Sequence, residues 1–407
     1  MMSQSEDQPQ TSISYGDLTS SQQRQRLIEL MTVFLRLGST AFGGPAAHIA
    51  MIDDEVVNRR KWLSRETLLD LLGVTNLIPG PNSTELVIHI GYLRGGWRGL
   101  FIAGASFILP AMVLVWTLAF FYQRYQTIPQ LNGLLYGIKP ALMAILVQAV
   151  WLFSQKALKN PSTRFAAVFA IVGYFLRWNE VLLLGLMGTG VMLAKNIHLR
   201  TPQMKALILP LMGGTTGLPS VLGLFPFPHA VYWVDVFWIF LKIGSVLYGS
   251  GYVLLAFLQR ELVEQRGWLT SQQMLDAVAI GQFTPGPVLT TATFIGYLLA
   301  GHPGAVAATT GIFLPAFILV WLVSPWVPKL RQSPWTSGFL DGLNAASLGL
   351  MVSVTITLSQ SALVDFLTIG LAVISAIAIL KFGINSAWLI IFGGLMGVGW
   401  GYLTNLL

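Results

Sequence analysis

Long apolar runs alternate with short polar segments along most of the chain. Five of these runs approach the roughly 20 residues that an α-helix needs to cross the hydrocarbon core of a bilayer. They are Gly99–Phe121, Leu134–Phe153, Val231–Phe257, Gly304–Val323 and Ile384–Leu406. This pattern predicts an all-α integral membrane protein with several spanning helices.

The composition favours the same class. Hydrophobic residues make up 54% of the 407 residues and charged residues only 10%, whereas about a quarter of a soluble domain is charged. The net charge of +7 is spread through the polar segments without a dense basic block, which favours membrane topology over a nucleic-acid partner. The chain has no cysteine, which excludes disulfides and thiolate metal sites. We expect no metal and no cofactor.

The sequence contains an internal repeat. A shift of 206 residues superposes FLRLGSTAFGG, which starts at Phe34, on FLKIGSVLYGS, which starts at Phe240. The same shift pairs two Pro-Gly-Pro corners, Pro79-Gly80-Pro81 and Pro285-Gly286-Pro287, and FILPAMVLVW aligns with IFLPAFILVW after a one-residue gap. The matches predict two homologous halves. The expected domains are a polar N-terminal tail over 1–26, a first repeat over 27–200, a linker over 201–230 and a second repeat over 231–407.

Each half places two short apolar pieces on either side of its Pro-Gly-Pro. In the first half these are Thr67–Ile78 and Ser83–Leu93, and at about 1.5 Å per residue each is too short to cross a bilayer. In each half the two short pieces are therefore expected to form a re-entrant helical hairpin that is broken at the Pro-Gly-Pro corner. With about five spanning helices beside it, each half crosses an odd number of times, so the two repeats have inverted topology.

The basic residues favour this topology. With the N-terminus outside, 15 of the 24 Lys and Arg residues fall in cytoplasmic segments and 6 fall outside. Positive charge accumulates on the cytoplasmic side of membrane proteins. We therefore expect a multi-pass protein of the inner (cytoplasmic) membrane with both termini outside.

The Pro-Gly-Pro corners are the candidate substrate site. Proline prevents a continuous helix, and broken backbone at membrane depth must face protein or a water-filled cavity. The helix that follows each corner directs its first N–H groups and the positive end of its dipole toward an anion, and paired breaks in inverted repeats mark the central site of transporters. The alternative is a corner that only turns two short helices. The candidate binding residues are Pro79, Gly80, Pro81, Asn82, Ser83, Thr84, Pro285, Gly286, Pro287, Thr290 and Thr291.

Three cations lie inside apolar runs. Arg36 and Lys242 are equivalent in the two repeats, whereas Lys139 has no charged equivalent. A charge at membrane depth faces a cavity or a partner, and Arg suits a tetrahedral oxyanion through bidentate hydrogen bonds. Arg36 and Lys242 are therefore candidates for the anion path, with snorkelling of Arg36 to the membrane surface as the alternative.

A few polar residues are candidates for coupling anion movement to protons. Glu85 and His89 are four residues apart and share a helix face. His48 follows FGGPAA, where the first span is expected to break near Gly43-Gly44-Pro45, as its equivalent in the second repeat is near Gly249-Ser250-Gly251. A carboxylate or an imidazole in a cavity can take up a proton. The second repeat has Thr291 in place of Glu85 and no equivalent of either histidine. Any proton site is therefore asymmetric, and a structural role is the alternative.

Two further segments have a functional and a structural interpretation. The FGGP segment either belongs to the substrate site or is a close packing point of helices; its residues are Phe42, Gly43, Gly44 and Pro45. Glu55 and Arg60 are expected to hold an amphipathic segment at the membrane surface, where Trp62 would be an interfacial anchor.

The motifs FGGPAAHIAMIDDEVV, WLS, LIPGPNS, IGYLRGGWRG and FILPA, in this order, resemble the chromate ion transporter family. Long-chain members have two such domains, and the likeness covers almost the whole chain beyond the N-terminal tail. The resemblance implies an inner-membrane carrier that exports chromate, with sulfate as a related oxyanion. The family's motif positions correspond here to Phe42, Gly43, Gly44, Pro45, Glu55, Trp62, Pro79, Gly80 and Pro81. The second repeat departs from the motif, with YGSG at Tyr248–Gly251.

The apolar runs and the paired corners predict a secondary transporter of anions. The resemblance implies that it exports chromate, with sulfate as a related substrate, and so gives chromate resistance. No phosphate-binding Gly-Lys-Ser/Thr loop is present, so we do not expect ATP hydrolysis. An anion channel or a carrier for another oxyanion is the alternative. A membrane enzyme is disfavoured because the chain has no HExxH motif and no cysteine cluster. The expected partners are the oxyanion and the lipid bilayer, and a homodimer is among the oligomeric states left open.

Overall fold

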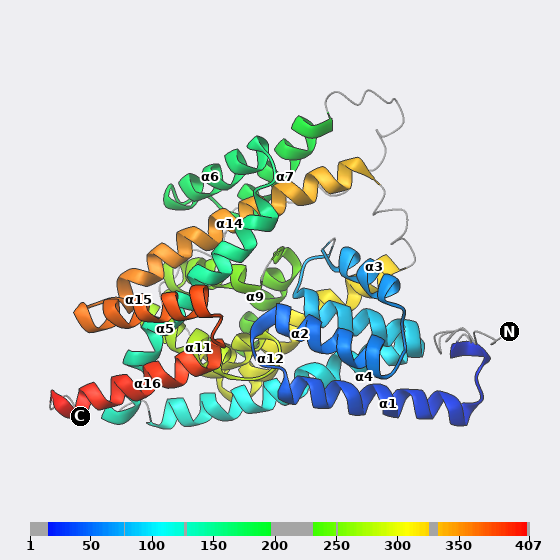
Figure 1. The fold of residues 1–407 in the computed structure, drawn as a ribbon, viewed down its shortest axis with the longest axis horizontal. Coiled ribbons are helices and arrows are strands. Elements are labelled where there is room, and N and C mark those ends of the chain that lie inside the picture. The colour runs from blue at the N-terminus through cyan, green and yellow to red at the C-terminus, as the bar shows by residue number, and fades with distance from the viewer. Residues whose placement is uncertain are drawn as a thin grey trace.

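The computed structural model describes residues 15–76, 78–125, 128–196, 231–249, 251–324 and 333–404. Every regular element in these ranges is helical (Figure 1). Five helices in them are long and apolar enough to cross a membrane, which confirms the prediction of an all-α membrane protein. The expected linker over 201–230 lies outside the described residues.

The first repeat begins with a helix that ends at a break and closes with three helices. Its elements are the 3-10 turn η2 (Tyr15–Asp17), α1 (Ser20–Thr40), α2 (Gly44–Asp53), the π-helical turn η3 (Asp54–Arg59), α3 (Arg65–Thr75), α4 (Asn82–Tyr125), α5 (Pro129–Ala157), α6 (Pro161–Phe175) and α7 (Glu180–Asn196). The first Pro-Gly-Pro corner lies between α3 and α4. Since α3 has only 11 residues, the short piece predicted before the corner is present.

The second repeat has the same order of elements. They are α9 (Trp233–Val246), the 3-10 turn η4 (Gly251–Val253), α10 (Leu254–Leu258), the π-helical turn η5 (Gln259–Gln265), α11 (Ser271–Phe283), the 3-10 turn η6 (Val288–Thr290), α12 (Thr291–Val323), α14 (Pro334–Ala362), α15 (Phe366–Phe382) and α16 (Ser386–Leu403). The second corner lies between α11 and η6. The apolar run over 231–257 is interrupted after α9, as the sequence predicts.

Helix α1 begins inside the stretch predicted as a polar tail. The Thr19 hydroxyl accepts a hydrogen bond from the Gln22 N–H, and the Gln22 side chain accepts one from the Thr19 N–H. This reciprocal capping box starts a helix without apolar burial. The stretch from Ser20 to Arg26, which the sequence assigned to the polar N-terminal tail, is therefore part of helix α1.

The long helix after the first corner turns back on itself near its start. At Gly95 and Gly96 the backbone leaves the helical conformation, and Gly96 has a φ of 59°. The backbones of Gly91 and Gly99 touch across this turn, although a straight helix would separate them by about 12 Å. α4 therefore consists of two antiparallel arms, over 82–94 and 97–125.

Helix α12 makes the same turn at Ala300 and Gly301, where the backbones of Gly296 and Gly304 touch. The short piece predicted after each corner thus ends at a glycine turn. The short helices on both sides of each corner have the lengths expected of a re-entrant hairpin. Their depth in a bilayer stays a prediction.

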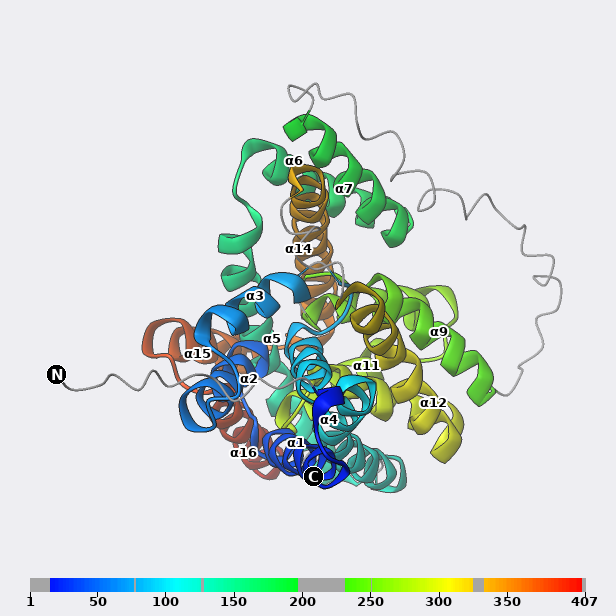
Figure 2. The same cartoon turned by 90° about the vertical axis from the view of Figure 1, so that its right-hand side faces the viewer.

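The closing helices of each repeat pack on the other repeat (Figure 1, Figure 2). α6 and α7 lie against α14, while α15 and α16 lie against α5. Because α5 and α14 hold equivalent places in the two repeats, the exchange is reciprocal. Reciprocal contacts are what a two-fold relation between two units produces. The direction of that axis relative to a membrane, and with it the inversion of the repeats, stays a prediction.

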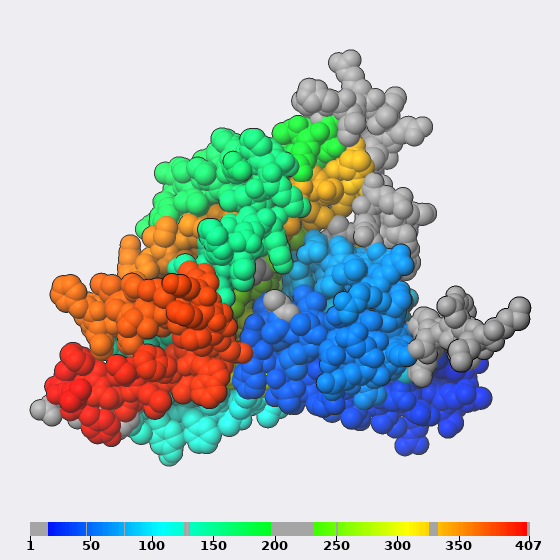
Figure 3. Space-filling model, viewed as in Figure 1, coloured from blue at the N-terminus to red at the C-terminus, as the bar shows by residue number. Residues whose placement is uncertain are grey.

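The exchange places the C-terminal helices beside the N-terminal helices. Figure 3 shows the N-terminal helices directly beside α15 and α16 on one face of the molecule. Gly137 of α5 packs on the backbone of Gly393 and Gly397 in α16. Small residues of this kind let membrane helices approach closely.

A β-carbon at Gly137 is expected to weaken the contact between the repeats. Gly137→Ala would press against the Gly393 carbonyl, and overpacking of a close contact costs about 1–3 kcal/mol. Gly399→Ala on the same partner helix is the control, since a β-carbon there meets no atom within 4 Å. Thermal unfolding of the purified protein in detergent should show a lower midpoint for Gly137→Ala only. Equal midpoints for the two variants would contradict the packing described here.

Candidate functional site

The two Pro-Gly-Pro corners are hydrogen-bonded to helix breaks in the opposite repeat. The Gly80 N–H donates to the Leu247 carbonyl over 2.7 Å, and the Gly286 N–H donates to the Ala41 carbonyl over 2.9 Å. Ala41 ends α1 and Leu247 ends α9, at positions that the repeat makes equivalent. These bonds satisfy backbone groups that the breaks leave open. The corners and breaks therefore meet in one region, the corner site, which comprises residues 41–45, 79–85, 247–249 and 285–291.

Each corner glycine has a backbone that favours glycine and lies against a helix of the other repeat. Gly80 and Gly286 have φ values of 145° and 93°, which favour glycine strongly. A β-carbon on Gly286 would lie 2.6 Å from that of Ala111 in α4, and one on Gly80 would lie 3.5 Å from that of Ala316 in α12. Ala111 and Ala316 are equivalent alanines that follow a proline. The corners thus rest on matching segments of the two long helices.

The first corner opens onto polar groups that have no partner. Thr84 and Glu85, in the first turn of α4, are both 0% exposed. Within the described residues, the Thr84 hydroxyl and both Glu85 carboxylate oxygens lack a hydrogen bond. The Glu85 side chain curls back so that Oε1 packs against Gly80. Since buried polar atoms in proteins are nearly always satisfied, these atoms indicate a place for a ligand, a proton or water.

The second corner has the same backbone but different polar chemistry. The Thr290 hydroxyl donates to the Pro287 carbonyl over 2.7 Å, and the Thr291 hydroxyl donates to the Val288 carbonyl over 2.9 Å. Both hydroxyl hydrogens are therefore engaged within their own turn. The unpartnered donors and acceptors of the first corner have no counterpart at these two threonines.

The FGGP segment closes the first break. Gly43 and Gly44 have φ values of 103° and 77°, and α2 begins at Gly44 with Pro45 in its first turn. Phe42 is 42% exposed, so its ring lies at the surface of the molecule. A β-carbon on Gly44 would lie 3.4 Å from the Tyr252 hydroxyl. The segment thus contacts the second repeat through backbone rather than through its aromatic ring.

His48 braces the first break against the helix that follows the first corner. The ring is buried, with Nε2 3.1 Å from the Ala41 carbonyl and Nδ1 3.5 Å from the Ser83 hydroxyl. Beside Ser83, the Asn82 side chain donates to the Asn76 side chain over 3.0 Å. These contacts support the structural interpretation of His48.

Arg36 and Lys242 are held by glutamates. Arg36 pairs with Glu55 and Lys242 pairs with Glu261, and in both pairs the glutamate is buried while about half of the cation's side chain is exposed. The arginine five residues after each glutamate approaches the same carboxylate at 2.6 Å. Each glutamate thus joins at least two cations, and Arg59 also approaches Glu55 at 4.0 Å. The role of Glu55 in holding the amphipathic segment at the membrane surface stays a prediction. A place in the anion path stays a prediction for Arg36 and Lys242.

Lys139 has a partner that the repeat comparison did not indicate. Its Nζ lies 2.8 Å from Oδ1 of Asp276 in α11, and the Tyr122 hydroxyl donates to Oδ2 over 2.8 Å. The side chains of Lys139 and Asp276 are both only 5% exposed. The sequence offered one signal for this pair. A buried cation needs a counter-ion, and Asp276 is the acid in the apolar stretch that forms α11.

Trp62 is buried at 2% exposure, so its assignment as an interfacial anchor is wrong. The Arg94 guanidinium lies 4.1 Å from the centre of the ring and also pairs with Glu29 at 2.7 Å. A cation over an aromatic face is attracted by the ring quadrupole. Trp62 therefore stabilises the packing between the break and α4.

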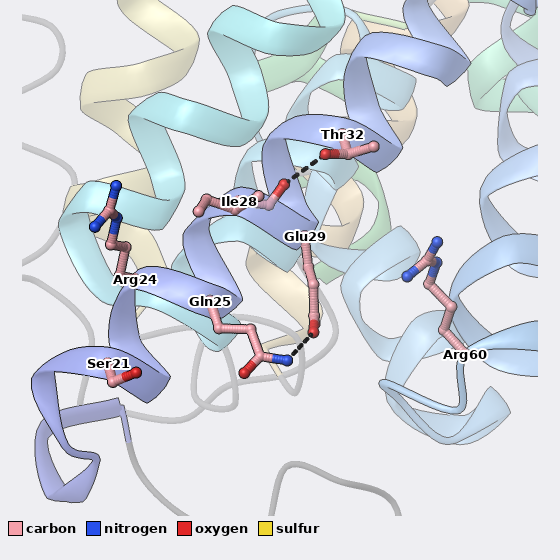
Figure 4. A pocket seen from close by; sticks show the side chains of 7 residues that line it. All are labelled: Ser21, Arg24, Gln25, Ile28, Glu29, Thr32 and Arg60. Atoms are coloured by element: carbon pink, nitrogen blue, oxygen red, sulfur yellow. Dashed lines mark hydrogen bonds between the residues drawn. The ribbon is translucent and has the colours of Figure 1, made fainter.

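A surface pocket lies along the first half of α1, away from the corners (Figure 4). Its volume is ≈ 410 Å³. It is lined by Ser21, Arg24, Gln25, Ile28, Glu29, Thr32 and Arg60. The Glu29 carboxylate is already engaged by Gln25 at 3.3 Å and by Arg94 at 2.7 Å. Because Thr32 stands about 12 Å from the end of α1 at 1.5 Å per residue, this pocket is separate from the corner site.

His89 lies one turn after Glu85 and is buried. Its Nδ1 lies 3.2 Å from the hydroxyl of Ser324 at the end of α12, whereas His48 faces Ser83. The two histidines therefore have separate partners. In the part of the chain described here, no group of three or more His, Cys, Asp or Glu side chains is arranged to hold a metal ion.

Glu55 gives a testable pH dependence. Burial alone would raise the pKa of this carboxyl, but the Arg60 hydrogen bond and the charges of Arg36 and Arg60 hold the pKa below its ordinary value. A lowered folded-state pKa means that the pairs stabilise the fold at neutral pH, and that this contribution is lost as the pH falls below the ordinary range of a glutamate. We expect the unfolding temperature in detergent to fall on acidification.

Glu55→Gln should be less stable at neutral pH by about 1–3 kcal/mol, because it loses charged hydrogen bonds, and it should respond less to acid. Asp54→Asn is the matched control, since Asp54 forms a surface pair with Arg59 at 2.8 Å, and surface pairs contribute little. The stabilising role of Glu55 would be refuted by wild-type stability and an unchanged acid response in Glu55→Gln.

Comparisons with known proteins bear on both repeats. The family model described as "Chromate transporter" matches residues 28–193 and again residues 234–398. The chromate transport protein of Cupriavidus metallidurans is 30% identical over 90% of this chain and 91% of its own length. The chromate transport protein of Pseudomonas aeruginosa is 31% identical over 86% of this chain and 85% of its own.

A probable chromate transport protein of Synechococcus elongatus is 28% identical over 88% of this chain and 91% of its own length. No solved structure matches the chain significantly. The family model covers both halves of the chain, one match to each repeat. The chain therefore belongs to the chromate transporter family.

Proposed function

We propose that this protein is a secondary transporter that exports chromate across the cytoplasmic membrane, lowers cytoplasmic chromate and accepts sulfate as a related oxyanion. Family membership and the names of the relatives support chromate as the substrate. We assign the substrate site to the two corners, because their hydrogen bonds to the opposite repeat bring the helix starts of both repeats into one region.

The first corner can bind an oxyanion without a free cation. The start of α4 presents backbone N–H groups and the positive end of the helix dipole. The buried and unpartnered Thr84 hydroxyl adds a donor at the same place. Arg36 and Lys242 are already paired with glutamates. A dianion held by dipoles and hydroxyls is also easier to release than one held by an ion pair, as transport requires.

The reciprocal contacts support alternating access. Each corner bonds to the break of the other repeat, so a movement of one repeat against the other changes both corners together. In the inverted arrangement the two corners approach the bilayer midplane from opposite sides. Our topology places both termini outside and the basic loops in the cytoplasm.

The membrane potential supplies a driving force for export. Moving negative charge out of an inside-negative cell is downhill by about 2.3 kcal/mol per charge per 100 mV. A dianion such as chromate carries two charges, so export needs no ATP. This agrees with the expectation that the protein is not an enzyme.

Everted membrane vesicles test the proposed function. Vesicles that contain the protein should accumulate labelled chromate above vesicles from cells without it, and an inside-positive potential should increase the accumulation. Unlabelled sulfate should compete. Accumulation of neither chromate nor sulfate would exclude the function, and a conductance far above carrier rates would identify a channel instead.

The corner glycines test the proposed site. Gly80→Ala and Gly286→Ala force a β-carbon onto positive-φ backbone that contacts the other repeat, so we expect at least tenfold slower chromate transport with membrane insertion retained. Gly190→Ala in α7 is the control, because its β-carbon meets no atom within 4 Å. Wild-type transport by both corner variants would remove the corners from the mechanism.

A further inference from the structure

The Glu85 carboxylate occupies the place where the proposed anion would bind. It lies in the first turn of α4 with Oε1 against Gly80, and it is completely buried. Neither oxygen has a hydrogen-bond partner within the described residues. At low dielectric an ionised carboxylate and a dianion repel each other strongly. The anion and the ionised form of Glu85 therefore exclude each other at this helix start.

Among the described residues, the elements around Glu85 offer titratable neighbours but no cation that pairs with its carboxylate. The first arm of α4 packs in an apolar cluster with α3 and α12, formed by Val74, Ile78, Ile88, Leu100, Ala316 and Val320. Tyr248, from the break after α9, is close enough to interact electrostatically with Glu85. His89 follows on the same face of α4, one turn later. In these surroundings the Glu85 carboxylate is therefore neutralised by a proton rather than by a neighbouring cation.

His89 leads from Glu85 toward the end of α12. The Ser324 hydroxyl donates to the Val320 carbonyl over 2.6 Å, so it accepts from the Nδ1–H of His89 at 3.2 Å. This arrangement leaves Nε2 as an acceptor, and Nε2 has no partner in the described part of the chain. Ser324 is only partly buried. The imidazole thus lies between the buried acid and a surface-accessible hydroxyl.

The second repeat lacks this arrangement. Thr291 takes the place of Glu85 and donates its hydroxyl hydrogen to the Val288 carbonyl. The residues around the matching position of His89 are Phe294 and Ile295, which are buried and apolar. The transporter therefore carries this acid–imidazole pair in its first repeat only.

We propose that Glu85 is a proton site that loads together with the oxyanion, with His89 and Ser324 as its route to the aqueous phase. The inference rests on the proposed function. The neutral acid releases the helix start to the anion and can donate its O–H to an anion oxygen. On unloading, the Glu85 proton passes to Nε2 of His89, directly or through one water, while the Nδ1 proton leaves through Ser324. Glu85 becomes a carboxylate and His89 stays neutral as the other tautomer.

The sign of the coupling follows from linkage. If protonation of Glu85 strengthens anion binding, anion binding must draw a proton onto Glu85 by the same factor. The protein should therefore take up protons with the dianion, approaching one per dianion once the pH is high enough to ionise Glu85 in the anion-free protein, and the affinity for the anion should fall as the pH rises over that range. The loaded site then carries one negative charge less than the bare dianion.

Calorimetric titration of the purified wild-type protein tests this at equilibrium. Sulfate, which stays a dianion near neutral pH, is titrated in buffers with different heats of ionisation, and chromate is titrated at alkaline pH for the same reason. The buffer dependence of the heat gives the number of protons taken up. We expect the number for wild type to rise toward one as the pH is raised to alkaline values, and Glu85→Gln to take up none at any pH. Binding of neither anion would refute the proposed function, whereas binding without proton uptake would refute only the present inference.

Infrared difference spectra give a second measurement. Addition of anion to wild type at alkaline pH, where Glu85 is ionised in the anion-free protein, should produce a carboxylic acid band, and Glu85→Asp should shift that band, which assigns it even if Glu85→Gln fails to fold. An absent band, or an unshifted band in Glu85→Asp, would overturn the proposal.

The route is tested by kinetics. His89→Gln and Ser324→Ala should keep the equilibrium proton count but slow proton uptake at least severalfold in stopped-flow records with a pH dye. His302→Gln is the matched control, since His302 is exposed on α12 and contacts Trp116 rather than the corner. Proton uptake at the wild-type rate in both route variants would assign the proton to another path.

Discussion

A peptide N–H or carbonyl without a partner is costly in hydrocarbon, and this chain interrupts its helices at four places near its centre. The structure meets that cost by pairing each Pro-Gly-Pro corner with the helix break of the other repeat, Gly80 with Leu247 and Gly286 with Ala41. Each of these hydrogen bonds joins the two repeats, so neither repeat alone could form them. The closing helices are exchanged in the same reciprocal way. α6 and α7 pack on α14, and α15 and α16 pack on α5. The backbone contacts at the corners therefore need both repeats.

Features that depend on local pattern can be predicted from the sequence. Proline and glycine act on their own backbone, so both corners and the interruption after α9 are visible in the printed chain. The internal repeat aligns Arg36 with Lys242, and in the structure both cations pair with equivalent glutamates. The class of the protein follows from the apolar runs alone.

Features that depend on how distant segments meet are not visible in the same way. Lys139 and Asp276 belong to different repeats, and only the interlocked arrangement brings them together. Trp62 near basic residues is typical of a membrane interface, but α4 turns back at its glycines and lays Arg94 over the ring. The start of α1 was missed because a capping box, rather than an apolar face, begins that helix.

The paired cations still have an electrostatic consequence for an anion carrier. In each repeat one buried glutamate joins two basic side chains, so the cluster of Arg36, Glu55 and Arg60 keeps a net charge of +1, and the second repeat has an equivalent cluster. Such clusters raise the local concentration of anions without offering an open ion pair. The buried pair of Lys139 and Asp276, in contrast, is neutral and contributes little field at a distance. The proposed function thereby assigns the attraction of the anion and its binding to different residues, so that the corner site would hold a dianion loosely enough to release it.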